Sequence, residues 1–317
     1  MRIVVTRRIP EAALAVLRDA GEVWMSGADR ALEPDELRKA VDGATAVVSM
    51  LHDRIDGGVA DAAGQGLRVV ANVAVGYDNV DVAALSERNV LVTNTPGVLT
   101  DATADLAFGL LLALTRRIGE GDRLLRAQRP WSFHLGFMLG SGLQGKTLGI
   151  VGLGAIGQAV ARRARAFGMK IVYSGRSRSA AEGELDARFV TREELLTTSD
   201  IVSLHCPLTP ETRHLIDAEA LGAMKTSAYL INTTRGPVVD EAALADAVRR
   251  GEIAGAGLDV FEKEPEVEPR LLDLDNVVLT PHLGSATVET RTEMALLAAH
   301  NVASVLAGKD PLNPVRA

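Results

Sequence analysis

The sequence contains a single cysteine, Cys206, among its 317 residues. An intrachain disulfide is therefore excluded, and such low cysteine usage is typical of a reducing compartment. Positive charge is not in excess either, because the net charge at pH 7 is −7. This balance argues against a broad nucleic-acid-binding surface.

Long apolar runs are also missing. The longest one, residues 106–114, covers about half of a membrane span, and residues 1–8 lack the apolar core of a signal peptide. No internal repeat and no low-complexity tract is present. We therefore predict a cytoplasmic protein without membrane association, long enough for two domains of ordinary size.

Short β-rich apolar runs alternate with helical patterns along the chain, which is typical of parallel α/β sheets. The first group of predicted strands covers residues 3–5, 22–25, 46–50, 68–73 and 90–93, and the second covers 147–151, 170–174, 201–205, 228–232, 256–260 and 277–280. Glycines that favour a left-handed helix end follow three predicted helices, at Gly21, Gly168 and Gly251. Thr191 and Glu194 predict a capping box at another helix.

A long helix is predicted over residues 102–118, and a Gly-rich, aromatic segment without a clear period follows at 129–142. The last predicted helix, 287–307, comes after the second group of strands is complete. We expect this helix to return to the first domain. A domain made of residues 1–99 and 287–317 would then be interrupted by a second domain, 100–286.

A glycine turn, Gly152-Leu153-Gly154-Ala155-Ile156-Gly157, lies between a β run and a helical pattern. In such a turn Gly152 permits the tight bend, Gly154 lets the backbone approach a pyrophosphate, and Gly157 lets the helix pack on the strand. The free N–H groups and the helix dipole then favour an anion. We predict a dinucleotide site here, with a purely structural turn as the alternative.

The residues that end the next strand indicate which dinucleotide is bound. An NAD site usually has an acidic residue about 20 residues after the turn, bonded to the ribose 2′-hydroxyl. Here the strand ends in Ser174-Gly175-Arg176-Ser177-Arg178, without an acid. The two arginines and two hydroxyls would bind a 2′-phosphate. We predict that NADPH is preferred, with NADH as the second candidate cofactor; the alternative is a solvated basic loop.

Three polar residues, Arg235, Glu264 and His282, each lie just past the end of a predicted strand. Singly they could be a surface arginine, a member of an acidic run and a core histidine. Together they lie where open α/β sheets place their ligands. An arginine can bind the carboxylate of a 2-keto acid with two bonds, a histidine can protonate its carbonyl oxygen, and a carboxylate can orient the imidazole and stabilise its charged form. We predict a catalytic set for hydride transfer.

With these motifs the chain resembles the D-isomer-specific 2-hydroxyacid dehydrogenases, and most closely their glyoxylate/hydroxypyruvate reductase branch. The resemblance includes residues 49–56, 72–81 and 94–105 and extends over nearly the whole chain. It implies two doubly wound parallel-sheet α/β domains: a discontinuous, flavodoxin-like substrate domain and a Rossmann nucleotide-binding domain.

The resemblance also implies roles for individual residues. Backbone N–H groups of Val75 and Gly76 would hold the substrate carboxylate, with Leu51 and Ser285 near the substrate. Residues that would border the cofactor are Thr103, Cys206, Pro207, Thr233 and Asp259, the last one at the nicotinamide carboxamide. One departure is Thr234, where relatives often carry alanine.

A homodimer through residues 120–142 is a further implication, in which Trp131 reaches the partner's pocket or packs in the interface. No metal site is expected, because the five histidines outside the catalytic set have no ligand spacing. We predict NADPH-dependent reduction of glyoxylate or hydroxypyruvate to glycolate or D-glycerate. The alternatives are another small 2-keto acid, or an NAD(P)-sensing regulatory protein on the same fold.

Overall fold

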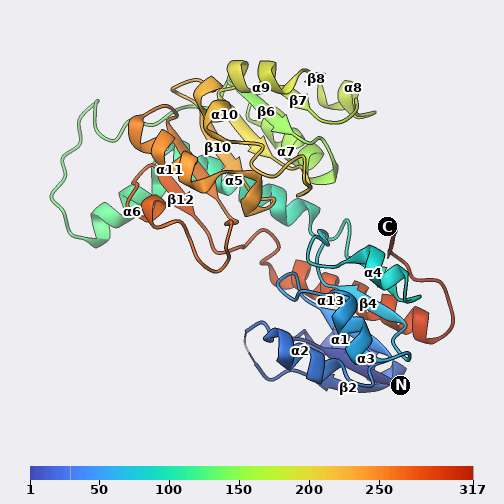
Figure 1. Cartoon of the computed structure of the whole chain (residues 1–317). Helices are drawn as coiled ribbons and strands as arrows, with labels where there is room; N and C mark the ends of the chain where they lie inside the picture. The colour runs from blue at the N-terminus through green and yellow to red at the C-terminus, as the bar shows by residue number, and fades with distance from the viewer. Residues whose placement is uncertain (29, 317) are drawn as a thin grey trace. The chain divides into compact units, whose positions relative to one another are not determined.

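The computed structural model describes residues 1–28 and 30–316, which form two compact units (Figure 1). Unit 1 comprises Met1–Leu99 and Ala286–Ala317, and unit 2 comprises Thr100–Ser285. Unit 1 is therefore built from both ends of the chain, whereas unit 2 is continuous in sequence. Among the described residues, no helix is both long and apolar enough to cross a membrane.

Unit 1 contains a six-stranded sheet in the order β13-β5-β4-β3-β1-β2. Its strands are β1 (Arg2–Val5), β2 (Glu22–Met25), β3 (Ala46–Ser49), β4 (Val69–Asn72), β5 (Leu91–Thr93) and β13 (Pro314–Val315). All neighbours pair in parallel except β13, which is antiparallel to β5. The parallel order 5-4-3-1-2 is that of flavodoxin-like folds.

Two groups of helices cover the sheet of unit 1. They are α1 (Glu11–Ala20), α2 (Pro34–Val41), α3 (Gly57–Ala63), α4 (Val82–Ser86) and α13 (Val288–Leu306). Side chains of α2, α3 and α4 share a buried cluster with Val4, Val47 and Val70 of the strands. The second group is formed by α13, which packs along α1 and on β3 and β4.

Unit 2 contains a seven-stranded sheet in the order β12-β11-β10-β9-β6-β7-β8, with every pair parallel. Its strands are β6 (Thr147–Val151), β7 (Lys170–Ser174), β8 (Ala187–Phe189), β9 (Ile201–Leu204), β10 (Tyr229–Asn232), β11 (Gly255–Leu258) and β12 (Val277–Leu279). This is the Rossmann order, in which the direction of winding reverses between β6 and β9. The predicted fold class is confirmed.

Helices pack on both faces of the unit 2 sheet. They are α5 (Thr100–Thr115), α6 (Ile118–Arg126), α7 (Ala155–Ala166), α8 (Glu182–Leu185), α9 (Arg192–Thr198), α10 (Ala218–Ala223), η1 (Gly236–Val238), α11 (Glu241–Arg250) and α12 (Pro269–Leu272). One buried cluster joins α5 and α7 to the sheet, and a second joins α9, α10 and α11 to it.

Several local predictions need correction. Gly168 and Gly251 are left-handed as predicted, with φ of 68° and 69°, but Gly21 is extended, with φ of 172°. A side chain at Gly21 would instead meet the carbonyl oxygen of Met1 at 2.5 Å. The hydroxyl of Thr191 caps α9, whereas the side chain of Glu194 pairs with Arg188 and does not complete a capping box.

The predicted helix 102–118 is three residues shorter at its C-terminal end than expected. It ends at Thr115, and Arg117 adopts a left-handed conformation, with φ of 55°, before α6 begins. After α6 the chain forms a long loop that extends away from the body of unit 2 (Figure 1). Trp131 and Phe133 of this loop are exposed, and Trp131 is stacked on the half-buried Phe137 with ring centroids 6.0 Å apart.

Candidate active site

The glycine turn links β6 to α7, and each glycine fills a different steric requirement. Gly152 has φ of 95°, and a side chain there would meet the backbone of His205 and Cys206 at 2.9 Å. A side chain at Gly157 would lie 2.3 Å from the carbonyl oxygen of Gly152, so helix and turn touch. Gly154 faces open space, with no atom within 4 Å of the position of a side chain.

The start of α7 suits an anion. No side chain caps the helix at Gly154, so its first N–H groups remain available for a ligand. The turn is held in place because the N–H of Gly152 donates to the carbonyl of Ser174 at 2.9 Å. Ala155 is exposed and Ile156 half-buried at this surface. The geometry therefore fits the pyrophosphate of a dinucleotide.

The end of β7 separates the two predicted arginines. Ser174 is buried, while Arg176, Ser177 and Arg178 are exposed. Arg178 donates to Glu182 at 3.0 Å and lies 5.2 Å from the ring centre of Phe189. Sequence spacing missed this carboxylate, because it comes from α8. Arg176 makes no hydrogen bond with another described residue and remains the better candidate for a 2′-phosphate.

Residues after β9 and β10 lie beside the glycine turn. Cys206 is buried, and burial raises the pKa of its thiol to about 11, which makes it a poor nucleophile at neutral pH. Its carbonyl accepts a hydrogen bond from the hydroxyl of Thr234, and Pro207 beside it is exposed. The buried hydroxyl of Thr233 has no hydrogen-bond partner among the described residues, which fits a polar group supplied by a cofactor.

Arg235 is presented by a turn that a buried amide organises. The side chain of Asn232, 1% exposed at the end of β10, donates to the carbonyl of Arg235 at 3.0 Å and accepts from the N–H of Thr234 at 3.1 Å. Asn232 was not among the predicted site residues. Its place at the last position of a buried strand was the only sequence signal.

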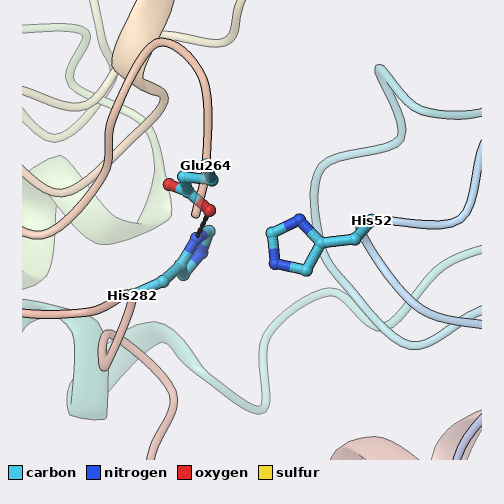
Figure 2. A group of neighbouring side chains, drawn as sticks. All are labelled: His52, Glu264 and His282. Carbon is cyan, nitrogen blue, oxygen red and sulfur yellow. Dashed lines mark hydrogen bonds and ion pairs between the residues drawn. The ribbon is translucent and has the colours of Figure 1, made fainter. Parts of the chain in front are cut away.

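Glu264 and His282 are brought together, as Figure 2 shows, by loops that follow β11 and β12. His282 Nδ1 lies 2.9 Å from Glu264 Oε2. The other oxygen, Oε1, accepts from the N–H of Phe261 at 3.0 Å, so the carboxylate is held at both ends. The carboxylate of Glu264 therefore bonds one of the two ring nitrogens and fixes the orientation of the imidazole. His52, also drawn in Figure 2, follows β3 in unit 1.

Asp259 holds the His282 loop. It is 1% exposed, and its carboxylate accepts from the Thr280 hydroxyl at 2.6 Å and from the N–H groups of Leu283 at 2.7 Å and Gly284 at 2.8 Å. Burial raises the pKa of Asp259, although these bonds act against it. The hydroxyl of Thr103 donates to the carbonyl of Gly284 at 3.1 Å. Both predicted cofactor neighbours therefore also fix the loop that ends at the half-buried Ser285.

In unit 1 the loop after β3 carries Leu51, which is half-buried. The side chain of Asn79 donates to the carbonyls of Met50 at 3.1 Å and Asp53 at 2.9 Å. Asp53, 2% exposed, accepts in turn from the N–H of Met50 at 2.7 Å. The loop is thus fixed from within its own unit.

The loop after β4 carries Val75 and Gly76. Their carbonyls accept from the side chains of Asn94 at 2.8 Å and Asn72 at 3.0 Å. Neither N–H of the pair has a hydrogen-bond partner among the described residues. These N–H groups suit an anion such as a carboxylate. These asparagines were not among the predicted site residues, although Asn72 is the last residue of β4 and Asn94 follows β5.

Known proteins are similar to this chain over most of its length. The family model for the D-isomer specific 2-hydroxyacid dehydrogenase, NAD binding domain, matches residues 108–284. A glyoxylate reductase from Pyrococcus horikoshii is 49% identical over 315 residues, which cover 98% of this chain and 94% of that protein.

Two solved structures are also similar. A protein from Thermus thermophilus is 48% identical, with a TM-score of 0.93 and coverage of 100% of both chains. An NADPH-dependent glyoxylate/hydroxypyruvate reductase from Sinorhizobium meliloti, in complex with NADP and malonate, is 36% identical, with a TM-score of 0.87 and coverage of 99% of this chain and 96% of that one.

Proposed function

We propose, from the premise that the chain belongs to the D-isomer specific 2-hydroxyacid dehydrogenase family and is an NAD(P)-dependent oxidoreductase, that it reduces glyoxylate or hydroxypyruvate with NADPH. The products would be glycolate and D-glycerate. The observation that carries the proposal is the bond between His282 Nδ1 and Glu264 Oε2, which supports a role for the other ring nitrogen in protonating a carbonyl oxygen. The choice of these two acids is supported by the similarity to a glyoxylate reductase and to a glyoxylate/hydroxypyruvate reductase.

Each residue of the site has a separate role in the proposed reaction. NADPH, when bound, supplies the hydride that adds to the carbonyl carbon of the acid. His282 gives its proton to the carbonyl oxygen, and Glu264 orients the ring through its bond to Nδ1. Arg235 binds the substrate carboxylate and polarises the carbonyl. The N–H groups of Val75 and Gly76 bind the same carboxylate.

Cofactor choice and assembly complete the proposal. Arg176 selects NADPH, because no acid lies at the end of β7 to repel a 2′-phosphate. Unit 2 holds the cofactor and unit 1 is the substrate domain. The apolar side chains of the loop 129–142 suit a homodimer interface, since Phe133 and Leu135 are 80% and 90% exposed.

The first experiment measures initial rates of NADPH oxidation with glyoxylate, hydroxypyruvate, pyruvate and phenylpyruvate, each repeated with NADH. Fast turnover of the first two with NADPH is expected. A preference for pyruvate or phenylpyruvate would replace the substrate and keep the reaction. Tight NADPH binding without turnover of any acid would favour a nucleotide-sensing protein.

The proton donor is tested by His282→Ala, with His300→Ala as the control because His300 is exposed on α13. Loss of general acid catalysis should lower kcat about 10²- to 10⁴-fold in the first variant, with NADPH affinity retained. The control should keep the kcat of the wild type. Equal kcat in all three proteins would exclude His282 as the proton donor.

A further inference from the structure

The loops that carry Arg235 and Glu264 are in direct backbone contact. Gly236, which follows the arginine, lies so close to the next loop that a side chain there would meet the carbonyl carbon of Phe261 at 1.8 Å and the nitrogen of Glu262 at 2.3 Å. Phe261 also donates its N–H to Glu264. A shift of either loop would therefore displace the other.

A reciprocal pair of hydrogen bonds joins the same two loops. The N–H of Glu241 donates to Oε1 of Glu262 at 3.0 Å, and the N–H of Glu262 donates to Oε1 of Glu241 at 2.6 Å. Glu241 is the first residue of α11, so its N–H has no partner within the helix. Each carboxylate thus accepts a hydrogen bond from the backbone N–H of the other residue.

The carboxylate of Glu241 has an unusual environment. Its side chain is buried, with 6% of the residue exposed. Burial raises its pKa to about 7, and the charges of Glu262 and Glu268 add to the rise. Two further groups face this acidic cluster: His214 Nε2 lies 3.4 Å from Glu262 Oε1, and Arg270 donates to Glu268 at 2.8 Å. A buried carboxyl with a specific bond to a catalytic loop is more than a solvated surface charge.

We propose that Glu241 is a positioning residue, which with Glu262 clamps the loop of Arg235 to the loop of Glu264. The inference rests on the proposed function, since the two loops are assigned to substrate binding and to orientation of His282 there. The clamp sets the spacing between the arginine that orients the acid and the carboxylate that orients the proton donor. Small errors in that spacing are costly in catalysis.

The test compares Glu241→Ala with Glu241→Gln, which keeps an oxygen that accepts from Glu262. Glu252→Ala, at the exposed turn after α11, is the control. We expect Glu241→Ala to lower kcat/KM for the acid about 10- to 100-fold, through both kcat and KM, with the KM for NADPH unchanged. Glu241→Gln should restore most of the loss. Wild-type kinetics in Glu241→Ala would overturn the proposal.

Two readouts do not depend on turnover. Hydrogen exchange of the Glu262 N–H should be faster in Glu241→Ala, and the ¹⁵N shift of His282 Nδ1 should report a weakened bond to Glu264. Unchanged exchange and an unchanged shift would refute the clamp even in an active enzyme. If the wild type turned over no acid, the proposed function would fail, and these two readouts alone would decide the clamp.

The ionisation of Glu241 gives a third check. Because its folded pKa is raised from about 4.5 to about 7, its contribution to stability is present at low pH and is lost as pH rises through about 7. The unfolding temperature of the wild type should therefore fall more between about pH 5 and about pH 8 than that of Glu241→Gln. Equal slopes would show that Glu241 does not titrate in this buried setting, and would contradict a role for its buried carboxyl in the clamp.

Discussion

At the scale of single residues, His282 holds a backbone conformation that L-amino acids rarely adopt. Its φ is 54°, and its N–H donates to the carbonyls of Asp259 at 2.8 Å and Thr280 at 3.0 Å. A left-handed residue of this kind costs about 1 kcal/mol or more and persists only where its surroundings determine it. Here the surroundings are the buried carboxylate of Asp259 and its three donors.

The cofactor prediction belongs to this scale, because it concerns one guanidinium. Arg176→Ala should raise the KM for NADPH about 10- to 100-fold and leave the KM for NADH nearly unchanged, since only NADPH has the 2′-phosphate. Arg178→Ala is the matched control, because Arg178 is already paired with Glu182. The measurement is kcat/KM for both cofactors in both variants. A larger effect at Arg178 would reverse the assignment.

At the scale of elements, the site is assembled where parallel strands end. The turn after β6 lies beside the residues that follow β9, and the catalytic set follows β10, β11 and β12. Parallel strands direct these ends to one edge of the sheet, where a doubly wound fold places its ligand. The role of the glycine turn at this edge can be tested by substitutions that add a single methyl group.

Gly157→Ala and Gly154→Ala should impair different properties: the first should lower stability, and the second should weaken NADPH binding. The new methyl at Gly157 would lie 2.3 Å from the carbonyl of Gly152, so the unfolding temperature should fall, by an overpacking cost of about 1–3 kcal/mol. At Gly154 the protein offers open space and φ is −77°, so stability should be nearly unchanged while NADPH affinity falls. Thermal unfolding and NADPH fluorescence titration separate the two. Unaltered NADPH binding by Gly154→Ala would argue against close approach of a pyrophosphate.

Much at this scale was predictable from sequence, since period and punctuation are local signals. The predicted strands and the glycine turn correspond to β1 to β7 and β9 to β12. What sequence could not show are contacts between residues far apart in the chain. The pair Glu182–Arg178, the donors around Asp259 and the close approach of Gly21 to Met1 all depend on the folded backbone. The short edge strands β8 and β13 were missed because they have too few residues for a pattern.

At the scale of the whole molecule, the two units differ in continuity. Unit 1 depends on α13, whose buried side chains include Met294, Val302 and Val305, and on β13, which closes the edge beside β5. Asn301, fully buried, also bonds Asn313 at 2.9 Å and ties the helix to the segment before β13. Unit 2 has both of its cores within 100–285.

A fragment of residues 100–285 should therefore fold alone and bind NADPH. A fragment of residues 1–99 should not fold, because it lacks the helix that covers β3 and β4. Joining residues 286–317 to it by a flexible linker should restore structure. Circular dichroism and thermal unfolding of the three fragments check this, and a cooperative transition in 1–99 alone would contradict it.

The split of unit 1 has a consequence during synthesis on the ribosome. All of unit 2 is synthesised before the first residue of α13. The Rossmann domain can therefore fold and bind its nucleotide before the helix that completes unit 1 has been made. For that interval β3 and β4 lack the cover that α13 provides in the finished protein. A nascent chain stopped before residue 286 would then expose an apolar sheet face, which makes this stretch of translation the one at which a chaperone would be needed.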